Sequence, residues 1–399
     1  MSKYIIIIAV IYSMVILLPT GSSAATDNIY TLDEITPAPT WEGTTGNRLQ
    51  SSSTYGDESV VTFNLPWDFV FYGHTYSAGT PVILDTNGNI WFNSNISTSA
   101  HSFGLDTTAG RGPVIAAWND DLSSAYYGGV FVQHKTDLPL GERVVIEWQT
   151  ETQADEGFFV PNSFETILFK DGRIRIDYGA IKTLFGADGG SGISRGDGTY
   201  NDITTNVASA PTLADRSFFY TPMQKNLTVN FTGTGGGTVT INPPGIAINT
   251  NYTTQFFAST PLTLHPAADP VSIFSGWTSV GSCSGSGDCS MTLDTDTTVT
   301  AGFDRDTAHQ VYAPGSTPPY FSTIQAAYNK IASDNGVNGT TIKVWATDYS
   351  EIVNCNQLID VTLQGGYDSG YANQVGTTVI RGALKISQGK VIANGIAIR

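Results

Sequence analysis

A series of short alternating segments between Gly112 and Gly179 constrains the fold more than any other feature of the sequence. In VVIEWQ, residues 144–149, and in IRIDY, residues 174–178, apolar and polar side chains largely alternate. Successive side chains of a β-strand point to opposite faces of a sheet, so a period of two is the mark of strands. The pattern predicts an antiparallel sheet with one face buried and the other in contact with water.

Composition supports an all-β fold and excludes one class of partner. The chain has 399 residues, enough for roughly two to four domains, and only 14% of its residues are charged. The abundance of Gly, Ser, Thr and Asn suits strands joined by turns better than helices rich in Glu and Lys. The formal net charge of −16 repels phosphate backbones, so nucleic acid is not expected as a partner.

The first 25 residues have the pattern of a secretory signal peptide. Lys3 precedes the apolar run Tyr4–Leu18, and small residues follow at 21–25. The apolar run is shorter than the roughly 20 residues that a membrane-spanning helix needs, and no later run is longer or more apolar. We therefore expect a secreted, extracellular or cell-surface protein with no transmembrane segment in its mature chain, although the sequence alone leaves the periplasm open.

Several motifs of residues 26–222 occur together in a known domain. They are LPWDFVFYG (65–73), the hairpin PVILDTNGNIWF (81–92), GPVIAAWNDDLS (112–123), ERVVIEWQTET (142–152) and SFETILFKDGRIRIDYG (163–179). In this order they resemble the nidogen-like extracellular domain, and the resemblance implies a β-sandwich over residues 26–222. Within the hairpin, Asn87-Gly88 independently predicts a type I′ turn, in which both central residues have positive φ.

Residues 226–304 form a second block of alternating strands, with Gly-rich turns between them. This block resembles a divergent internalin-type bacterial repeat, which implies a small all-β domain. Cys283 and Cys289 enclose a flexible five-residue segment, SGSGD, and the compartment is expected to be oxidising. We predict a disulfide between them, which leaves Cys355 as a buried, unreactive thiol.

Residues 305–399 begin with a linker and the one helical pattern of the mature chain. In FSTIQAAYNKIAS, residues 321–333, apolar side chains recur at helical spacing after a Ser or Thr cap. Short strands follow up to residue 398, and the whole block resembles the capping helix and first rungs of a right-handed parallel β-helix. The strand at 390–398 would expose an unpaired edge, which predicts self-association or contact with a partner on the cell surface.

Few residues point to chemistry. The five histidines lie singly, without the i, i+2 or i+4 spacing that aims two imidazoles at one ion, so neither a metal site nor a cofactor is predicted. Gly192–Gly196 spells G-x-S-x-G, but a turn sequence follows where a nucleophile elbow needs a helix. Asp120 and Asp121 could cap a turn or contact a hard cation or a ligand, and the sequence leaves both roles open.

These observations favour a non-enzymatic protein that acts in adhesion or binds an extracellular surface, matrix or polysaccharide ligand. Sandwiches and repeats display loops on stiff scaffolds without bringing acids and bases together. The alternative is a carbohydrate-active extracellular enzyme, because acids from distant strands can meet in space. Nothing in the sequence selects such an acid pair.

Overall fold

The computed structural model describes residues 27–45, 56–125, 128–137, 139–183, 190–204, 213–278, 283–334 and 339–399. The predicted signal peptide lies outside these residues. The described part of the chain is built of strands with one α-helix, which confirms the all-β class. It divides into two compact units, one containing residues up to Phe69 with Thr75–Pro222, the other Val70–His74 with Met223–Arg399.

The first unit contains two antiparallel sheets. One sheet has the strand order β1-β15-β12-β11-β10-β8, with β9 also paired to β10, and the other has the order β14-β13-β7-β6-β5-β2. The strands of the first sheet are β1 (Tyr30–Glu34), β8 (Leu122–Ser123), β9 (Gly129–Lys135), β10 (Arg143–Thr152), β11 (Asn162–Phe169), β12 (Ile174–Tyr178) and β15 (Ser217–Pro222). Those of the second are β2 (Val60–Asn64), β5 (Pro81–Asp85), β6 (Asn89–Trp91), β7 (Val114–Asn119), β13 (Gly190–Ser194) and β14 (Tyr200–Thr204). Outside both sheets β3 (Phe69–Phe71) pairs with β4 (His74–Tyr76), and residues 70–74 of this ribbon are assigned to the second unit.

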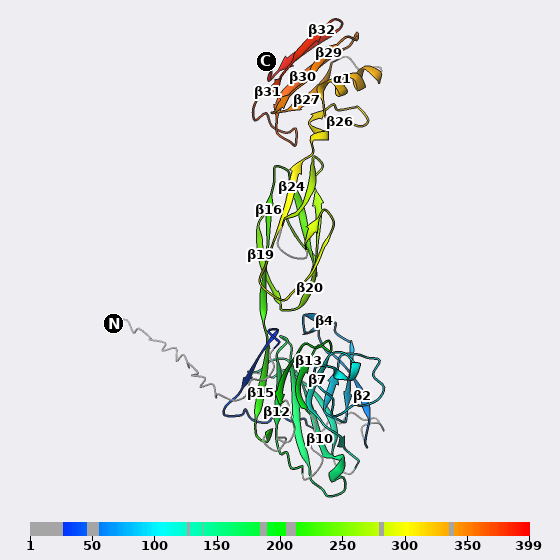
Figure 1. The fold of residues 1–399 in the computed structure, drawn as a ribbon, viewed down its shortest axis with the longest axis vertical. Helices are drawn as coiled ribbons and strands as arrows, with labels where there is room; N and C mark the ends of the chain where they lie inside the picture. Colours follow the sequence, from blue (N-terminus) through cyan, green and yellow to red (C-terminus); the bar gives the residue numbers. More distant parts are fainter. Residues whose placement is uncertain are drawn as a thin grey trace, which may run out of the picture. The chain divides into compact units, whose positions relative to one another are not determined.

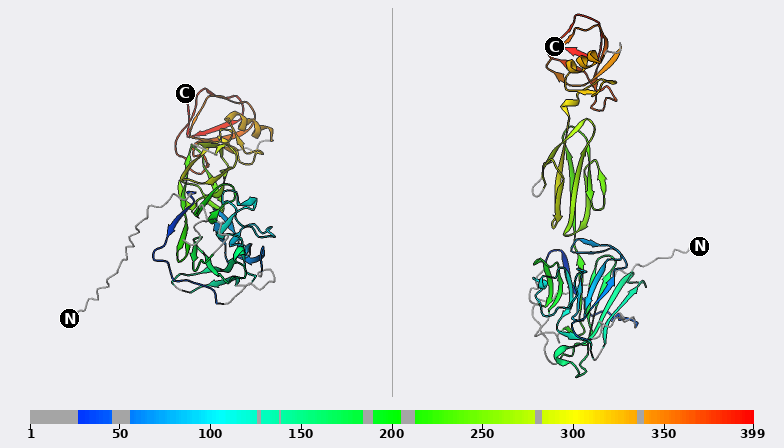
Figure 2. Two further views of the ribbon diagram at one scale, coloured as in Figure 1. Left: turned by 60° about the horizontal axis from the view of Figure 1, so that its bottom comes forward. Right: turned by 90° about the vertical axis from the view of Figure 1, so that its right-hand side faces the viewer.

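The two sheets pack face to face (Figures 1 and 2). Aromatic side chains make contacts in the core between them. The ring of Trp148 on β10 stacks on Phe164 of β11 at 5.4 Å, and Trp118 of β7 meets Phe164 edge-on at 5.8 Å. Trp148 also donates its indole N–H to the backbone oxygen of Asp85, at the end of β5, at 2.8 Å. These contacts join both sheets in one core, so this unit is a β-sandwich.

The prediction that the long sheet has a water-facing side is wrong for its central strands. Glu147, Glu165, Arg175 and Asp177 lie on the polar side of β10–β12, yet each is at most 5% exposed. The segment 41–45 lies over them and bonds to their carboxylates through its backbone amides. The alternation correctly identified the strands. Their charged side chains, however, form an internal layer that residues 41–45 cover, and this segment is distant in the sequence.

The hairpin between β5 and β6 also differs from the prediction in one detail. Gly88 has a positive φ of +80°, but Asn87 is not among the residues with positive φ, so the turn is not type I′. The strands pair Leu84 with Ile90, which leaves a longer loop than a two-residue turn. Asn87 is instead fully buried and bonds through its side chain to other segments.

Residues 224–305 form two further sheets, of orders β19-β16-β24-β21-β22 and β18-β17-β20-β23. Their core contains Leu227, Val229, Val239, Trp277 and Phe303. All pairs are antiparallel except β16 with β24, which is parallel. The strands are β16 (Gln224–Thr232), β17 (Gly237–Asn242), β18 (Ile246–Ile248), β19 (Tyr252–Phe257), β20 (Thr260–Ala268), β21 (Ser272–Thr278), β22 (Ser284–Gly285), β23 (Cys289–Leu293) and β24 (Thr297–Arg305).

In residues 311–398 short parallel strands stack in three rows: β27-β30-β33, β28-β31-β34 and β29-β32. The helix α1 (Ile324–Ser333) is capped by Thr323, whose hydroxyl accepts the amide N–H of Ala326 at 3.1 Å. It buries its predicted apolar positions, Ile324, Ala327, Tyr328 and Ile331. The strands are β25 (Val311–Tyr312), β26 (Tyr320–Phe321), β27 (Thr340–Trp345), β28 (Asp348–Tyr349), β29 (Ile352–Cys355), β30 (Asp360–Tyr367), β31 (Thr378–Ile380), β32 (Ala383–Ile386), β33 (Lys390–Asn394) and β34 (Ile396–Ile398).

The internalin-type and β-helix resemblances of these two blocks stay predictions, as does self-association through the last strands. Among the described residues β33 pairs only with β30 and β34 only with β31. Ile392 and Ile398 on these strands are 44% and 51% exposed.

Candidate functional site

The structure separates the two aspartates that the sequence singled out. β7 ends at Asn119, so Asp120 and Asp121 lie in the link to β8. Asp120 is fully buried, and its Oδ1 accepts the backbone N–H of Asp121 at 2.8 Å. Asp121, in contrast, is half-buried, so part of its surface is exposed to solvent.

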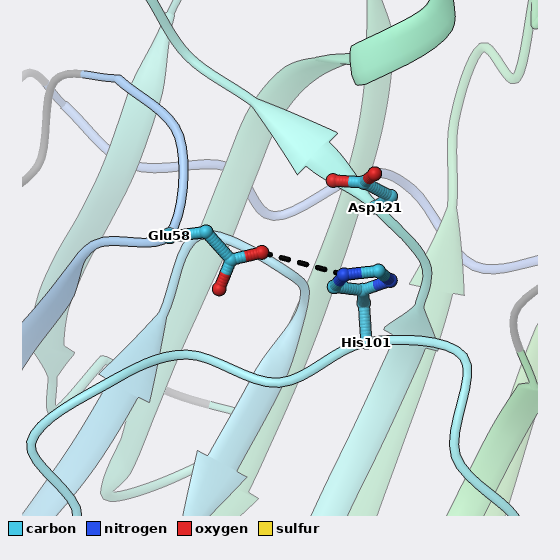
Figure 3. Close-up of side chains that lie close together, drawn as sticks. All are labelled: Glu58, His101 and Asp121. Atoms are coloured by element: carbon cyan, nitrogen blue, oxygen red, sulfur yellow. Dashed lines mark ion pairs between the residues drawn. The ribbon is translucent and has the colours of Figure 1, made fainter.

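Asp121 lies beside Glu58 and His101, and the donor atoms of the three side chains are all within 4.8 Å of one another (Figure 3). Glu58 Oε1 and His101 Nε2 are 3.4 Å apart, and these side chains are 44% and 37% exposed. Glu58 precedes β2 and takes a positive φ of +54°, while His101 lies in the loop after β6. Three segments far apart in the sequence therefore deliver two carboxylates and one imidazole to one point of the sandwich.

The buried side chain of Asn87 joins these three segments. Its Nδ2 donates to Ser99 Oγ at 2.8 Å and to Glu58 Oε1 at 3.4 Å, and its Oδ1 accepts the backbone N–H of Leu122 at 2.8 Å. Ser99 Oγ in turn donates to Glu58 Oε2 at 2.8 Å. One buried amide thus positions Glu58 directly, and positions His101 and Asp121 through near neighbours in the chain.

Further carboxylates surround this group. Burial raises the pKa of Asp57, and the nearby charges of Asp121, Glu58 and Glu156 raise it further, against the lowering effect of a backbone hydrogen bond from Glu58. Glu156 is held in place by Ser123, whose Oγ donates to its Oε1 at 2.7 Å. The negative charges of Asp57, Glu58, Asp121 and Glu156 make this end of the sandwich suitable for binding a cation or a basic group.

Sequence reasoning found Asp121 but missed Glu58 and His101. No local pattern could have identified them, because neither is close in the sequence to the other or to Asp121. The sequence predicted no metal site, because no two histidines have the local spacing of metal ligands, whereas the grouping here uses a single histidine with two acids.

A second group of acids lies under the segment 41–45. Glu165 and Asp177 are cross-strand partners on β11 and β12. Burial, with Asp177 alongside, raises the pKa of Glu165 to about 8, and burial likewise raises the pKa of Asp177. Both oxygens of Glu165 accept backbone N–H groups, from Glu42 at 2.9 Å and Gly43 at 2.8 Å. Glu165 is thus engaged in holding this segment and is fully buried, while Asp177 accepts a hydrogen bond from Arg175 Nε at 2.9 Å.

The G-x-S-x-G motif lies at the end of β13 and has no nucleophile elbow. Ser194 is buried, and its Oγ donates to the backbone oxygen of Leu105 at 2.5 Å. The turn that follows leads into another strand, β14, and in it Arg195 Nε contacts Asp197 Oδ2 at 2.7 Å. Ser194 therefore serves as a structural residue.

Cys283 and Cys289 are joined in a disulfide, and both are buried in the core of residues 224–305. Cys355 on β29 is a buried free thiol, and burial raises its pKa to about 11. A thiol in such an environment is a poor nucleophile and a poor metal ligand, because both reactions need the thiolate.

Comparison with known proteins assigns the fold of the sandwich to a family. A family model described as NIDO related matches residues 30–262, more than half of the chain. The chain belongs to the NIDO-related family. The matched range contains the whole sandwich from β1 onward and continues past Pro222 into the second unit. No curated protein matches the chain.

Membership of the NIDO-related family indicates an extracellular protein of the nidogen type. The intramolecular disulfide is compatible with that location. Within the described ranges, the single helix is too short and too polar to cross a membrane.

Proposed function

We propose that this NIDO-related protein is a non-enzymatic extracellular protein that binds a surface, matrix or polysaccharide ligand, and that the end of its sandwich next to Asp121 makes the contact. One observation carries the proposal. Phe158 and Phe159, separated from Glu156 by Gly157 alone, are 67% and 71% exposed. Singly exposed apolar residues are common, but two adjacent exposed aromatic rings beside a charged group are typical of a contact surface.

The surroundings of these rings support a role in binding. Glu156, two residues before Phe158, lies near the acids around Asp121, because the charges of Glu156, Asp121 and Glu58 all raise the pKa of Asp57. The surface therefore combines aromatic side chains, which stack on sugars or apolar groups, with carboxylates that attract basic groups. The short 3-10 turn Gln153–Asp155, which follows β10, holds the loop on the end of a long strand.

The enzymatic alternative has less support. The acid pair with raised pKa values, Glu165 and Asp177, is buried beneath segment 41–45. A glycosidase needs two carboxyl groups that flank an accessible scissile bond.

A single retention screen tests the proposal. The purified chain is passed over immobilised polysaccharides and extracellular matrix proteins, and both retention and the release of reducing ends are measured. Phe158→Ser with Phe159→Ser should reduce retention at least tenfold. Leu140→Ser is the matched control, because Leu140 is 43% exposed in the turn before β10, at the other end of that strand.

The control variant should be retained like the original chain, and no reducing ends should appear. Retention that survives loss of both phenylalanines would refute the assignment of the surface. Turnover of a polysaccharide that disappears on mutation of one acidic pair would show instead that the protein is an enzyme.

A further inference from the structure

The group Glu58, His101 and Asp121 has the chemistry of a metal site. It brings two carboxylate donors and one imidazole donor within 4.8 Å of one another (Figure 3). We propose that these three side chains bind a divalent transition-metal ion, with Zn²⁺ as the representative ion. The proposal does not depend on which extracellular ligand the protein binds.

The closest pair already has the spacing of such a site. Zn²⁺ holds histidine nitrogen and carboxylate oxygen at roughly 2.0–2.2 Å, so two ligand atoms of a tetrahedral site lie roughly 3.4 Å apart. Glu58 Oε1 and His101 Nε2 are 3.4 Å apart. Asp121 is half-buried, and its carboxylate, within 4.8 Å of the other two donor atoms, would supply the third ligand. A water molecule or a ligand group would complete the coordination.

The hydrogen-bond pattern around Glu58 is of the kind that orients metal ligands. Bound carboxylates are usually fixed by neighbours outside the coordination sphere. Here Ser99 Oγ donates to Glu58 Oε2 at 2.8 Å, and Oε1 lies 3.4 Å from both His101 Nε2 and Asn87 Nδ2. Asn87 is fully buried and bonds to Ser99, Glu58 and the residue after Asp121, so the donor geometry is set by the core of the sandwich.

The local charge also favours a cation. His101 is one imidazole beside two carboxylates. A third acid, Asp57, lies near enough to Asp121 and Glu58 to feel their negative charges. Glu151 on β10 adds a buried carboxylate next to Ser123: the residue is 1% exposed, and its Oε1 receives no hydrogen bond from the described residues. The ion pair between His101 and Glu58 can neutralise at most one of these carboxylates, so this pair does not balance most of the negative charge.

The imidazole decides the class of ion. Ca²⁺ and Mg²⁺ prefer sites made entirely of oxygen ligands, whereas imidazole with carboxylates suits Zn²⁺ and its first-row neighbours. A site for a hard cation would use the acids and be indifferent to His101. This difference gives the proposal a direct test.

Isothermal titration calorimetry of the chelator-treated full chain with ZnCl₂ measures the site, and CaCl₂ and MgCl₂ are titrated in parallel. One Zn²⁺ should bind, and Glu58→Gln, His101→Gln and Asp121→Asn should each weaken binding at least tenfold. Ser99→Ala, which leaves the three proposed ligands in place but removes the hydrogen bonds of Ser99 Oγ to Glu58 and Asn87, should weaken it by about tenfold or more. Because Glu58, His101 and Asp121 lie in three different segments, misfolding of one variant, detected by circular dichroism without metal, leaves the others as tests.

The matched control is His134→Gln. His134 Nε2 lies 3.2 Å from Glu142 Oε1, and the two side chains are 39% and 30% exposed, so the pair resembles Glu58 with His101. Within the described ranges the pair belongs to no group of three donors. This variant should bind Zn²⁺ like the original chain. Equal binding by His101→Gln, loss of binding in His134→Gln, or Ca²⁺ binding that is as tight as Zn²⁺ binding would each overturn the proposal.

Discussion

Replacement of Glu42 by glutamine should destabilise the sandwich far more than loss of an ordinary surface ion pair. The Glu42 carboxylate lies 2.8 Å from Arg143 Nε, 3.3 Å from Arg175 Nη2 and 3.5 Å from Lys135 Nζ. The side chains of Glu42, Arg143 and Arg175 are only 3% to 6% exposed. Removal of one partner from a buried ion pair costs about 3–5 kcal/mol, because it leaves a charge that water cannot reach.

The arrangement of the remaining acids places the expected loss near the lower end of that range. After the substitution Arg143 keeps Asp137 at 3.2 Å, and Arg175 keeps Asp177 at 2.9 Å. Each guanidinium therefore retains one carboxylate, although Asp137 is 67% exposed and compensates weakly. We expect the free energy of unfolding to fall by about 3 kcal/mol.

Urea unfolding followed by tryptophan fluorescence measures this loss, and Glu34→Gln provides the control. Glu34 also pairs with an arginine, Arg216, at 2.8 Å, but these side chains are 26% and 37% exposed. The control should lose at most about 1 kcal/mol, and salt should reduce its effect. A Glu42→Gln loss no larger than that of Glu34→Gln would refute the argument that the layer under segment 41–45 is desolvated.

Three further predictions follow from the described residues. Burial raises the pKa of Glu165 to about 8 in the folded state. An acid whose pKa is higher in the folded than in the unfolded state stabilises the fold fully at a pH below its unfolded pKa, and this stabilisation is lost as the pH rises through the folded pKa. Glu165→Gln should therefore reduce the fall in the urea-unfolding free energy between pH 5 and pH 9. Reduction of the Cys283–Cys289 disulfide should cost about 2 kcal/mol in urea unfolding, while iodoacetamide should label the buried Cys355 only after unfolding, as seen by mass spectrometry. If the last strands self-associate, Ile392→Lys should lower the molar mass measured by light scattering at micromolar concentration, and an unchanged mass would argue against that edge.

The elements of the fold were largely predictable because their signals are local. The alternation in residues 144–149 falls within β10, and the i, i+3, i+4 and i+7 apolar spacing in residues 321–333 identified α1. What remained hidden is which elements meet. A period of two says that Glu165 and Glu147 share a side of the sheet, but not that residues 41–45 will cover that side.

Asn87 illustrates why the candidate site could not be predicted in the same way. Its pairing with Gly88 is a sound local signal for a hairpin, and the hairpin is present. That signal predicted positive φ at Asn87, but the side chain is instead buried, with its amide committed to Glu58, Ser99 and Leu122. A buried amide must find partners wherever packing places them, so long-range contacts override the local turn preference. The positions of Glu58, His101 and Asp121 follow from that same packing, which is why three residues without any shared motif form one group.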